Sequence, residues 1–271
     1  MGDLAQICVI LTNLALLPAI GYACWVVAIK KDYSFTLEAA TAMAVLAFGV
    51  VFHICDVDPA NFNPDSDSTL CIENICVNET SCAFTRDENK FEILQRASFE
   101  ATYTLVALIA ISLANIKPFV AKFFILGAAY VVIHFGFKDD RRFKTERFLF
   151  AFLGVFWSIG WLFARILIDF RSYRHNNSEI NKSEFIQIIA SVAPLKQCLI
   201  PATVLMLVAL VGNFGFADNH FDTPKSKTYL YVHAWVWQFP FFLSFYFIYK
   251  FSYVWNQQKQ KLFEDKSVRG Y

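Results

Sequence analysis

Charged side chains are scarce in this 271-residue chain. Only 17% of its positions are Asp, Glu, Lys or Arg, whereas 56% are hydrophobic, and its mean hydropathy is +0.42. This balance exceeds what a water-soluble domain needs to fill its core, and it indicates a polytopic membrane protein. The formal net charge of +1 offers no basic or acidic surface for a nucleic acid. Membrane lipid is the expected partner.

The sequence also lacks internal repeats and the short alternating strands of an outer-membrane barrel. It contains long apolar runs instead, each close to the roughly 20 residues that a transmembrane helix needs. Seven such runs occur, at 4–29, 35–54, 97–115, 118–136, 148–169, 186–214 and 228–251. The longest polar stretch, from Asp56 to Arg96, is interpreted as a loop. The sequence therefore predicts an all-α membrane protein: a single seven-helix transmembrane domain over 1–271, with one long loop over 55–96.

Positive charge follows the odd-numbered runs. Lys30 and Lys31 come after the first, Arg171 and Arg174 after the fifth, and a basic segment, 259–269, after the seventh. The positive-inside rule places these exits in the cytosol, so the N-terminus is expected outside and the C-terminus in the cytosol. The basic segment at 138–147, after the fourth run, points the other way.

The loop at 55–96 supports this orientation, because it is acidic and carries an N-glycosylation sequon at Asn78. Both features are typical of an extracellular loop. Two further sequons, at Asn176 and Asn181, fall on the predicted cytosolic side and are expected to stay unmodified.

No C-x-x-C pair occurs, which disfavours a zinc site made of cysteines. Four of the seven cysteines, Cys55, Cys71, Cys76 and Cys82, lie in the long loop or at its edge. An even number in an oxidising compartment indicates two disulfides, for which three pairings are possible. The nested pairing of Cys55 with Cys82 and Cys71 with Cys76 is preferred, because it ties the end of the second run toward the third.

Histidines gather at one predicted depth, the outer leaflet. His53 and His134 end outward-running helices, His233 lies near the start of the seventh run, and His220 precedes it. Imidazoles that arrive from several helices at one depth can bind zinc. For His134 and His220 the sequence favours an interfacial ring bonded to solvent or backbone. For His53 and His233 it leaves two interpretations open, a zinc ligand and an interfacial ring.

Two further features have plainer interpretations. Glu38, near the start of the second run, is predicted to be a helix-start or packing carboxylate. The aromatic run at 229–247 is predicted to be mostly lipid-facing, with Pro240 kinking or loosening the helix.

At these residues the sequence resembles the myomaker branch of the TMEM8 family, within the superfamily of alkaline ceramidases and adiponectin-type receptors. The matching fragments are "LTNLALLP" at 11–18, "FHICD" at 52–56, "SCAFTRDENKFEIL" at 81–94 and "YLYVHAWVW" at 229–237. Their order and spacing, more than any single fragment, carry the resemblance.

The resemblance implies an outer-leaflet zinc site held by a histidine of the second helix and an H-x-x-x-H pair of the seventh. His53 and His233 match two of these positions, whereas Trp237 stands in place of the third histidine. Because indole cannot ligate zinc, His220 is the candidate third ligand. Asp56 matches the aspartate of the family's H-A-C-D motif and is assigned a role supporting the site or capping the helix.

The hydrolases of the superfamily also carry an aspartate on the third helix, beside the zinc. Ser98 stands at that position here, where a hydroxyl can position a water but cannot act as a carboxylate base. Glu100 lies two residues on, about 200° around the helix, and is expected to face elsewhere.

Two functions follow from the resemblance. The first is a non-enzymatic cell–cell fusion protein that acts on plasma-membrane lipid at the hemifusion step of myoblast fusion, as a homodimer and with or without a small partner protein; the Golgi is a second expected location. The alternative is a zinc-dependent lipid amidase or esterase, for which Trp237 and Ser98 leave the hydrolase constellation incomplete. A G-protein-coupled receptor ranks below both, since no D-R-Y or N-P-x-x-Y signature occurs at the expected places.

Overall fold

A computed structural model describes most of the predicted helices. It covers residues 4–56, 70–72, 75–77, 88–113, 116, 118–136, 160, 164, 168, 171, 195–216 and 227–267. Apart from isolated positions, the fifth predicted run at 148–169 lies outside these residues. Cys82, Asn78 and His220 lie outside them as well.

The described chain is almost entirely helical. Its first half contains α1 (Leu4–Thr12), the 3-10 helix η1 (Asn13–Leu16), α2 (Leu17–Ala28), the 3-10 helix η2 (Tyr33–Phe35), α3 (Thr36–Asp56), α4 (Glu88–Leu113) and α5 (Phe119–Gly136). Its second half contains the π-helix η4 (Leu195–Leu199), α8 (Ile200–Phe216), α9 (Lys227–Val232), the π-helix η5 (His233–Gln238) and α10 (Phe239–Ser267). The strands β1 (Leu70–Ile72) and β2 (Ile75–Val77) form a short antiparallel hairpin between α3 and α4.

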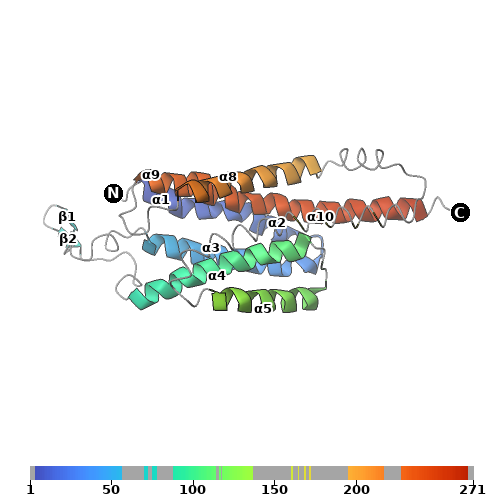
Figure 1. Ribbon diagram of the computed structural model, residues 1–271, viewed down its shortest axis with the longest axis horizontal. Coiled ribbons are helices and arrows are strands. Elements are labelled where there is room, and N and C mark those ends of the chain that lie inside the picture. Colours follow the sequence, from blue (N-terminus) through green and yellow to red (C-terminus); the bar gives the residue numbers. More distant parts are fainter. Residues whose placement is uncertain are drawn as a thin grey trace.

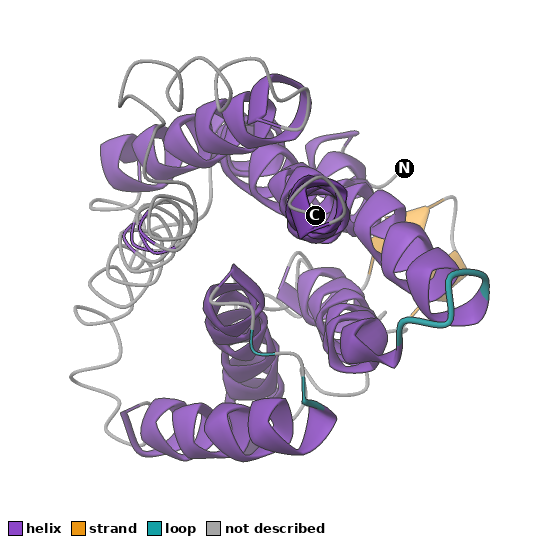
Figure 2. Ribbon diagram, turned by 90° about the vertical axis from the view of Figure 1, so that its right-hand side faces the viewer, coloured by secondary structure: helices purple, strands orange, loops and turns teal. Residues whose placement is uncertain are grey.

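The helices run roughly along one long axis (Figure 1). The β1–β2 hairpin lies at one end of the molecule, called here the hairpin end, and α10 projects beyond the other described helices at the opposite end. α3 packs against α2 and α4, α4 packs against α5, and α10 packs against α2 and α8. Figure 2 looks along the axis and shows the helices side by side, with the end of α10 toward the viewer.

Among the described residues, three helical segments are long and apolar enough to cross a membrane: Ile7–Ala28, Tyr33–Ile54 and Ile93–Leu113. Two shorter apolar helices, Phe119–Phe135 and Gln197–Gly212, accompany them in the described part of the chain. These segments agree with the predicted helical membrane character. The number of seven spans and the orientation of the termini stay predictions.

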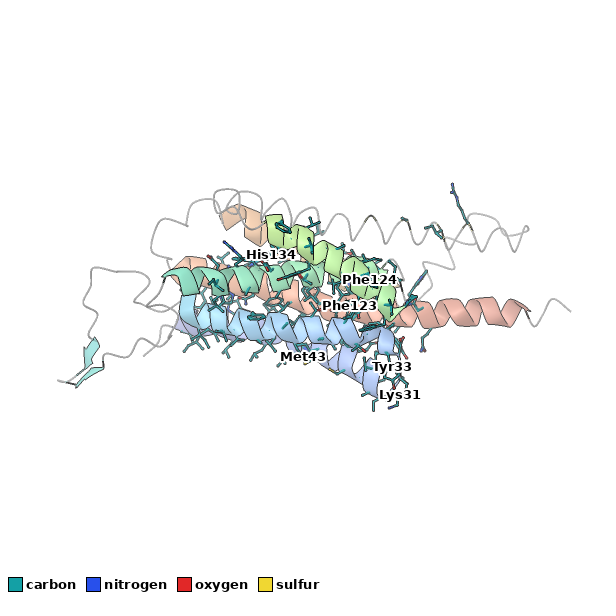
Figure 3. The ribbon with its side chains drawn as sticks, turned by 90° about the horizontal axis from the view of Figure 1, so that it is seen from below. Lys31, Tyr33, Met43, Phe123, Phe124 and His134 are labelled. Atoms are coloured by element: carbon teal, nitrogen blue, oxygen red, sulfur yellow. The ribbon has the colours of Figure 1, made fainter. Side chains whose placement is uncertain are left out.

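The aromatic run at 229–247 is not mostly lipid-facing, and that prediction is wrong. Phe241, Phe242 and Phe245 are at most 6% exposed, and they belong to the main hydrophobic core. The reason is topological, since α10 lies between α2 and α8 and buries side chains against both. The exposed apolar side chains gather elsewhere, for example at Phe123 and Phe124 of α5 (Figure 3).

The predicted loop is also shorter than expected, because α4 begins at Glu88 and includes the segment 88–96. A search for apolar runs misses these first turns, which are rich in polar residues. Leu94 is nevertheless 7% exposed, so this polar segment already packs against the bundle.

The start of the last long helix is irregular in two ways: the π-helix η5 precedes it, and Pro240 is its second residue. The π-helix η5 ends two residues before Pro240, which has no N–H to donate to the carbonyl of Val236, four residues earlier. α8 approaches η5 closely here, since a Cβ on Gly212 would lie 3.0 Å from the Val236 carbonyl oxygen. Pro240 therefore loosens the helix locally, as the sequence predicts.

Candidate functional site

The structure brings together the two histidines that the zinc hypothesis pairs. The ring centroids of His53 and His233 are 5.5 Å apart, with the ring planes at 63°. His53 comes from the last turn of α3, and His233 is the first residue of η5. Both rings are half-buried. Two imidazoles from helices distant in the sequence thus meet near the hairpin end of the bundle.

Ser98 lies in the same region, on α4. The Phe52 ring, next to His53, has its centroid 6.0 Å from that of Phe99. Ser98 itself is 8% exposed, and its carbonyl oxygen accepts a hydrogen bond from Thr102 Oγ1 at 2.9 Å. The turn of α3 that carries His53 therefore packs against the turn of α4 that carries Ser98.

Trp237, which the resemblance places where the TMEM8 family has its third histidine, belongs to the aromatic core. Its ring stacks on Phe241 with centroids 4.8 Å apart and planes at 22°, and it packs against the main core cluster. This position therefore supplies packing and no metal ligand.

The residues that the structure describes contain no group of three His, Cys, Asp or Glu side chains placed to hold one metal ion. Zinc in proteins has three or four protein ligands, so His53 and His233 alone do not complete a zinc site. His220 and the side chains of Cys55 and Asp56 lie outside the described part of the structure.

Glu100 and His134 form a second polar group, which sequence reasoning missed. Glu100 is 5% exposed and accepts a hydrogen bond from Tyr130 Oη at 3.0 Å. Its Oε1 atom lies 3.0 Å from His134 Nδ1. Glu100 does face away from Ser98, toward α5. The His134 side chain is 48% exposed, in keeping with the predicted interfacial ring, but the partner of its Nδ1 atom is the buried Glu100 carboxylate and not solvent or backbone.

Toward the opposite end, Glu38 is a fully buried carboxylate with several partners. Lys122 Nζ lies 2.5 Å from Glu38 Oε1 and donates to the Ser34 carbonyl at 2.7 Å. Ser112 Oγ also donates to Glu38 Oε1. Glu38 is a packing carboxylate, as predicted, but it also joins α3 to α5 through an ion pair and α3 to α4 through a hydrogen bond. The missed signal was Lys122, since a lysine inside an apolar span requires a counter-charge.

In the hairpin, Cys71 stands directly opposite Cys76. Directly opposed residues on antiparallel strands have Cα atoms about 4.5–5.5 Å apart, within the range that a disulfide can bridge. This backbone register is compatible with the preferred pairing, which stays a prediction for both pairs of cysteines.

No model of a known protein family and no curated protein matches the chain. The resemblance to the TMEM8 family thus rests on the sequence fragments and on the residues that occupy its site positions.

Proposed function

We propose that this chain is a seven-span plasma-membrane protein of the myomaker branch, with its N-terminus outside, that promotes cell–cell fusion by acting on lipid. The observation that carries the proposal is which residues occupy the positions that the resemblance assigns to the hydrolytic site. His53 and His233 are paired, but Trp237 is stacked into the core and Ser98 stands where the hydrolases have an aspartate. A site of this composition lacks both the aspartate and the third histidine that the resemblance assigns to the hydrolases, which supports a non-enzymatic function.

Fusion requires a protein that contacts lipid over a large part of its surface. The side chains of Phe123, Phe124 and Val120 on α5 are between 57% and 70% exposed, which supports a lipid-accessible bundle. A homodimer, with or without a small partner protein, belongs to this proposal because apposed membranes must be brought close at the hemifusion step.

A co-culture assay tests the fusion function. Fibroblasts that express the chain and a cytosolic dye are mixed with muscle cells that carry a second dye, and the expected result is syncytia containing both. The Phe123→Ala/Phe124→Ala variant, which removes two exposed rings, should reduce fusion at equal surface delivery. Absence of content mixing by wild-type protein at the cell surface would rule out the function.

The orientation has its own test, because glycans are added only on the luminal side of the membrane. Enzymatic deglycosylation of Asn78→Gln and Asn181→Gln variants should show that only Asn78 carries a glycan. A glycan on Asn181 with Asn78 empty would invert the arrangement.

A zinc-dependent lipid amidase or esterase is the second candidate, favoured by the 5.5 Å approach of His53 and His233. Zinc, if bound with His220 as third ligand, would supply a polarised water for hydrolysis. The described residues contribute two imidazoles to such a site, and Ser98 could orient a water.

Metal analysis of purified full-length protein separates the two candidates. The hydrolase predicts about one zinc per chain that is lost in His53→Ala and His233→Ala, together with chelator-sensitive release of fatty acid. The Trp237→His variant rebuilds the H-x-x-x-H pair and should increase zinc retention if the site has the family geometry. His134→Ala, which changes a histidine bonded to Glu100, is the matched control.

A further inference from the structure

The Glu100–His134 pair places one polar atom on the exposed surface of α5. Oε1 of Glu100 lies 3.0 Å from Nδ1 of His134, and Oε2 accepts a hydrogen bond from Tyr130 Oη at 3.0 Å. The Glu100 side chain is 7% exposed, whereas the His134 side chain is 48% exposed. Because Nδ1 points toward a buried carboxylate, the exposed part of the ring is the edge that carries Nε2.

These contacts assign a role to each ring nitrogen. Oε2 of Glu100 accepts from Tyr130 and Oε1 faces Nδ1, as expected of an ionised carboxylate, which has no hydrogen to donate. Nδ1 therefore carries the hydrogen of this contact, and Nε2 of the neutral ring keeps its lone pair. Turning the ring over would place a carbon atom against Oε1 and lose the bond. A carboxylate bonded to one ring nitrogen also makes the other a stronger acceptor.

The side chains around His134 are apolar and exposed. Val131, Val132 and Phe135, in the last turns of α5, are between 51% and 65% exposed. In the described part of the chain, the hydrogen-bond partner of the ring is Glu100, through Nδ1. A polar atom that faces hydrocarbon without a hydrogen bond is unfavourable. The partner of Nε2 therefore has to come from the membrane or from water.

The exposed apolar surface continues from His134 toward the start of α5. Phe123 and Phe124 lie nearer that start (Figure 3), and both are more than half exposed. Between them and His134, nothing lies within 4 Å of the Cβ position of Gly127. The ten residues from Phe124 to His134 span about 15 Å. A lipid can thus lay its hydrocarbon along this face while its polar end reaches the imidazole.

We propose that His134 binds the hydroxyl group of a membrane lipid, which donates to Nε2 while the apolar body of the lipid lies along α5. A sterol or a diacylglycerol has both features, since it offers a donor at one end and hydrocarbon beyond it. The phosphate of a phospholipid suits the site less well, because it is an anion and would face the Glu100 carboxylate.

Glu100 is a positioning residue in this site, because it acts through the ring. The site lies on the face of α4 away from Ser98, and it stands without the proposed fusion and zinc functions.

Photolabelling of the full-length chain in phosphatidylcholine liposomes tests the proposal. Two probes carry a diazirine on their hydrocarbon, one a sterol and the other a diacylglycerol, and each has a matched O-methyl ether that cannot donate. Mass spectrometry of peptides locates the label. At least one alcohol should label α5 about two- to tenfold more than its ether, the effect of one hydrogen bond. His134→Phe should abolish this preference.

Equal labelling of α5 by alcohol and ether, with both probes, overturns the proposal, because contact with hydrocarbon alone gives that result. A water molecule bound at Nε2 in place of a lipid gives equal labelling as well. A preference that persists in His134→Phe overturns the proposal too. Tyr130→Phe is the matched control, since it removes the other donor to Glu100 and leaves the contact with His134; it should keep the preference.

Glu100→Gln tests the positioning role with a measurement that a loss of packing would not change. The glutamine amide can donate to Nδ1 while its oxygen accepts from Tyr130, so that Nε2 carries the hydrogen instead. An ether oxygen accepts from this N–H as an alcohol oxygen does. The preference for the alcohol should therefore disappear in this variant, with labelling of α5 retained.

Because Glu100→Gln keeps the imidazole, it also decides the question if His134→Phe does not fold. A preference for the alcohol equal to that of wild type would show that Nε2 is not the acceptor set by Glu100, and the proposal would fail.

Discussion

The Nζ atom of Lys122 lies 2.5 Å from Oε1 of Glu38, and neither side chain is more than 4% exposed. The pair connects α5 to α3, and Ser112 connects the same carboxylate to α4. A buried charge that loses its partner is far more costly than a pair replaced by apolar groups. This asymmetry gives the first prediction.

Lys122→Met should lower the free energy of unfolding by about 3–5 kcal/mol, because it leaves Glu38 buried without a counter-charge. The double variant Glu38→Leu/Lys122→Met should recover most of this loss. Chemical unfolding in detergent micelles measures both. A double variant no more stable than Lys122→Met would show that the charge pair is not the source of the effect.

Gly49→Ala should destabilise the bundle, because the added Cβ would come within 2.7 Å of Asn13 Oδ1. Overpacking of this kind costs about 1–3 kcal/mol. Gly21→Ala is the matched control, since nothing lies within 4 Å of its Cβ position and alanine favours the helix. Asn13→Ala should rescue Gly49→Ala when Tm values are compared, and failure of this rescue would contradict the assigned contact.

The Glu100–His134 contact should appear as coupling in a double-mutant cycle. Glu100→Gln and His134→Phe should be less than additive, with an interaction free energy of about 1 kcal/mol, typical of a hydrogen bond. Tyr130→Phe removes the other donor to Glu100 and should leave the coupling between positions 100 and 134 in place. Additive effects in thermal unfolding would show that the two side chains do not interact in solution.

Lys31→Gly should stabilise the protein. Lys31 has a φ of 58°, the only positive φ at a non-glycine position among the described residues, and this conformation costs a side chain about 1–2 kcal/mol. Figure 3 shows Lys31 in the turn beside Tyr33, at the end where α10 projects. Lys30→Gly is the control and should not stabilise, because its backbone gains nothing from glycine and its ammonium group lies over the Trp25 ring.

The helices were predictable wherever apolar residues form a long unbroken run. The run at 118–136 matches α5 (Phe119–Gly136), and the run at 35–54 matches α3 within two residues at its C-terminal end. α4 was predicted too short, because hydropathy does not detect the polar turns at 88–96. The 3-10 segment η1 and the two π-helices have no hydropathy signal, since they depend on local backbone bonding.

Within the candidate site, the sequence predicted those residues that the resemblance to the TMEM8 family assigns to it. It places His53 and His233 together, and the structure does so as well. The partners of Glu38 and Glu100 lie at least 30 residues away in the sequence, and their pairing depends on how α5 packs against α3 and α4. Lys122 and Tyr130 were available as signals, since polar groups within an apolar run require partners from other helices.

The length of α10 has a thermodynamic consequence. The helix meets α2 and η2 at Tyr253, whose ring lies 6.2 Å from Trp25 and 6.1 Å from Phe35, and then continues to Ser267. The segment 256–267 therefore extends about 18 Å past this contact, beyond the ends of the other helices in the described part of the chain (Figure 1). A surface that binds this segment meets a helix already formed, so binding does not have to order the backbone first.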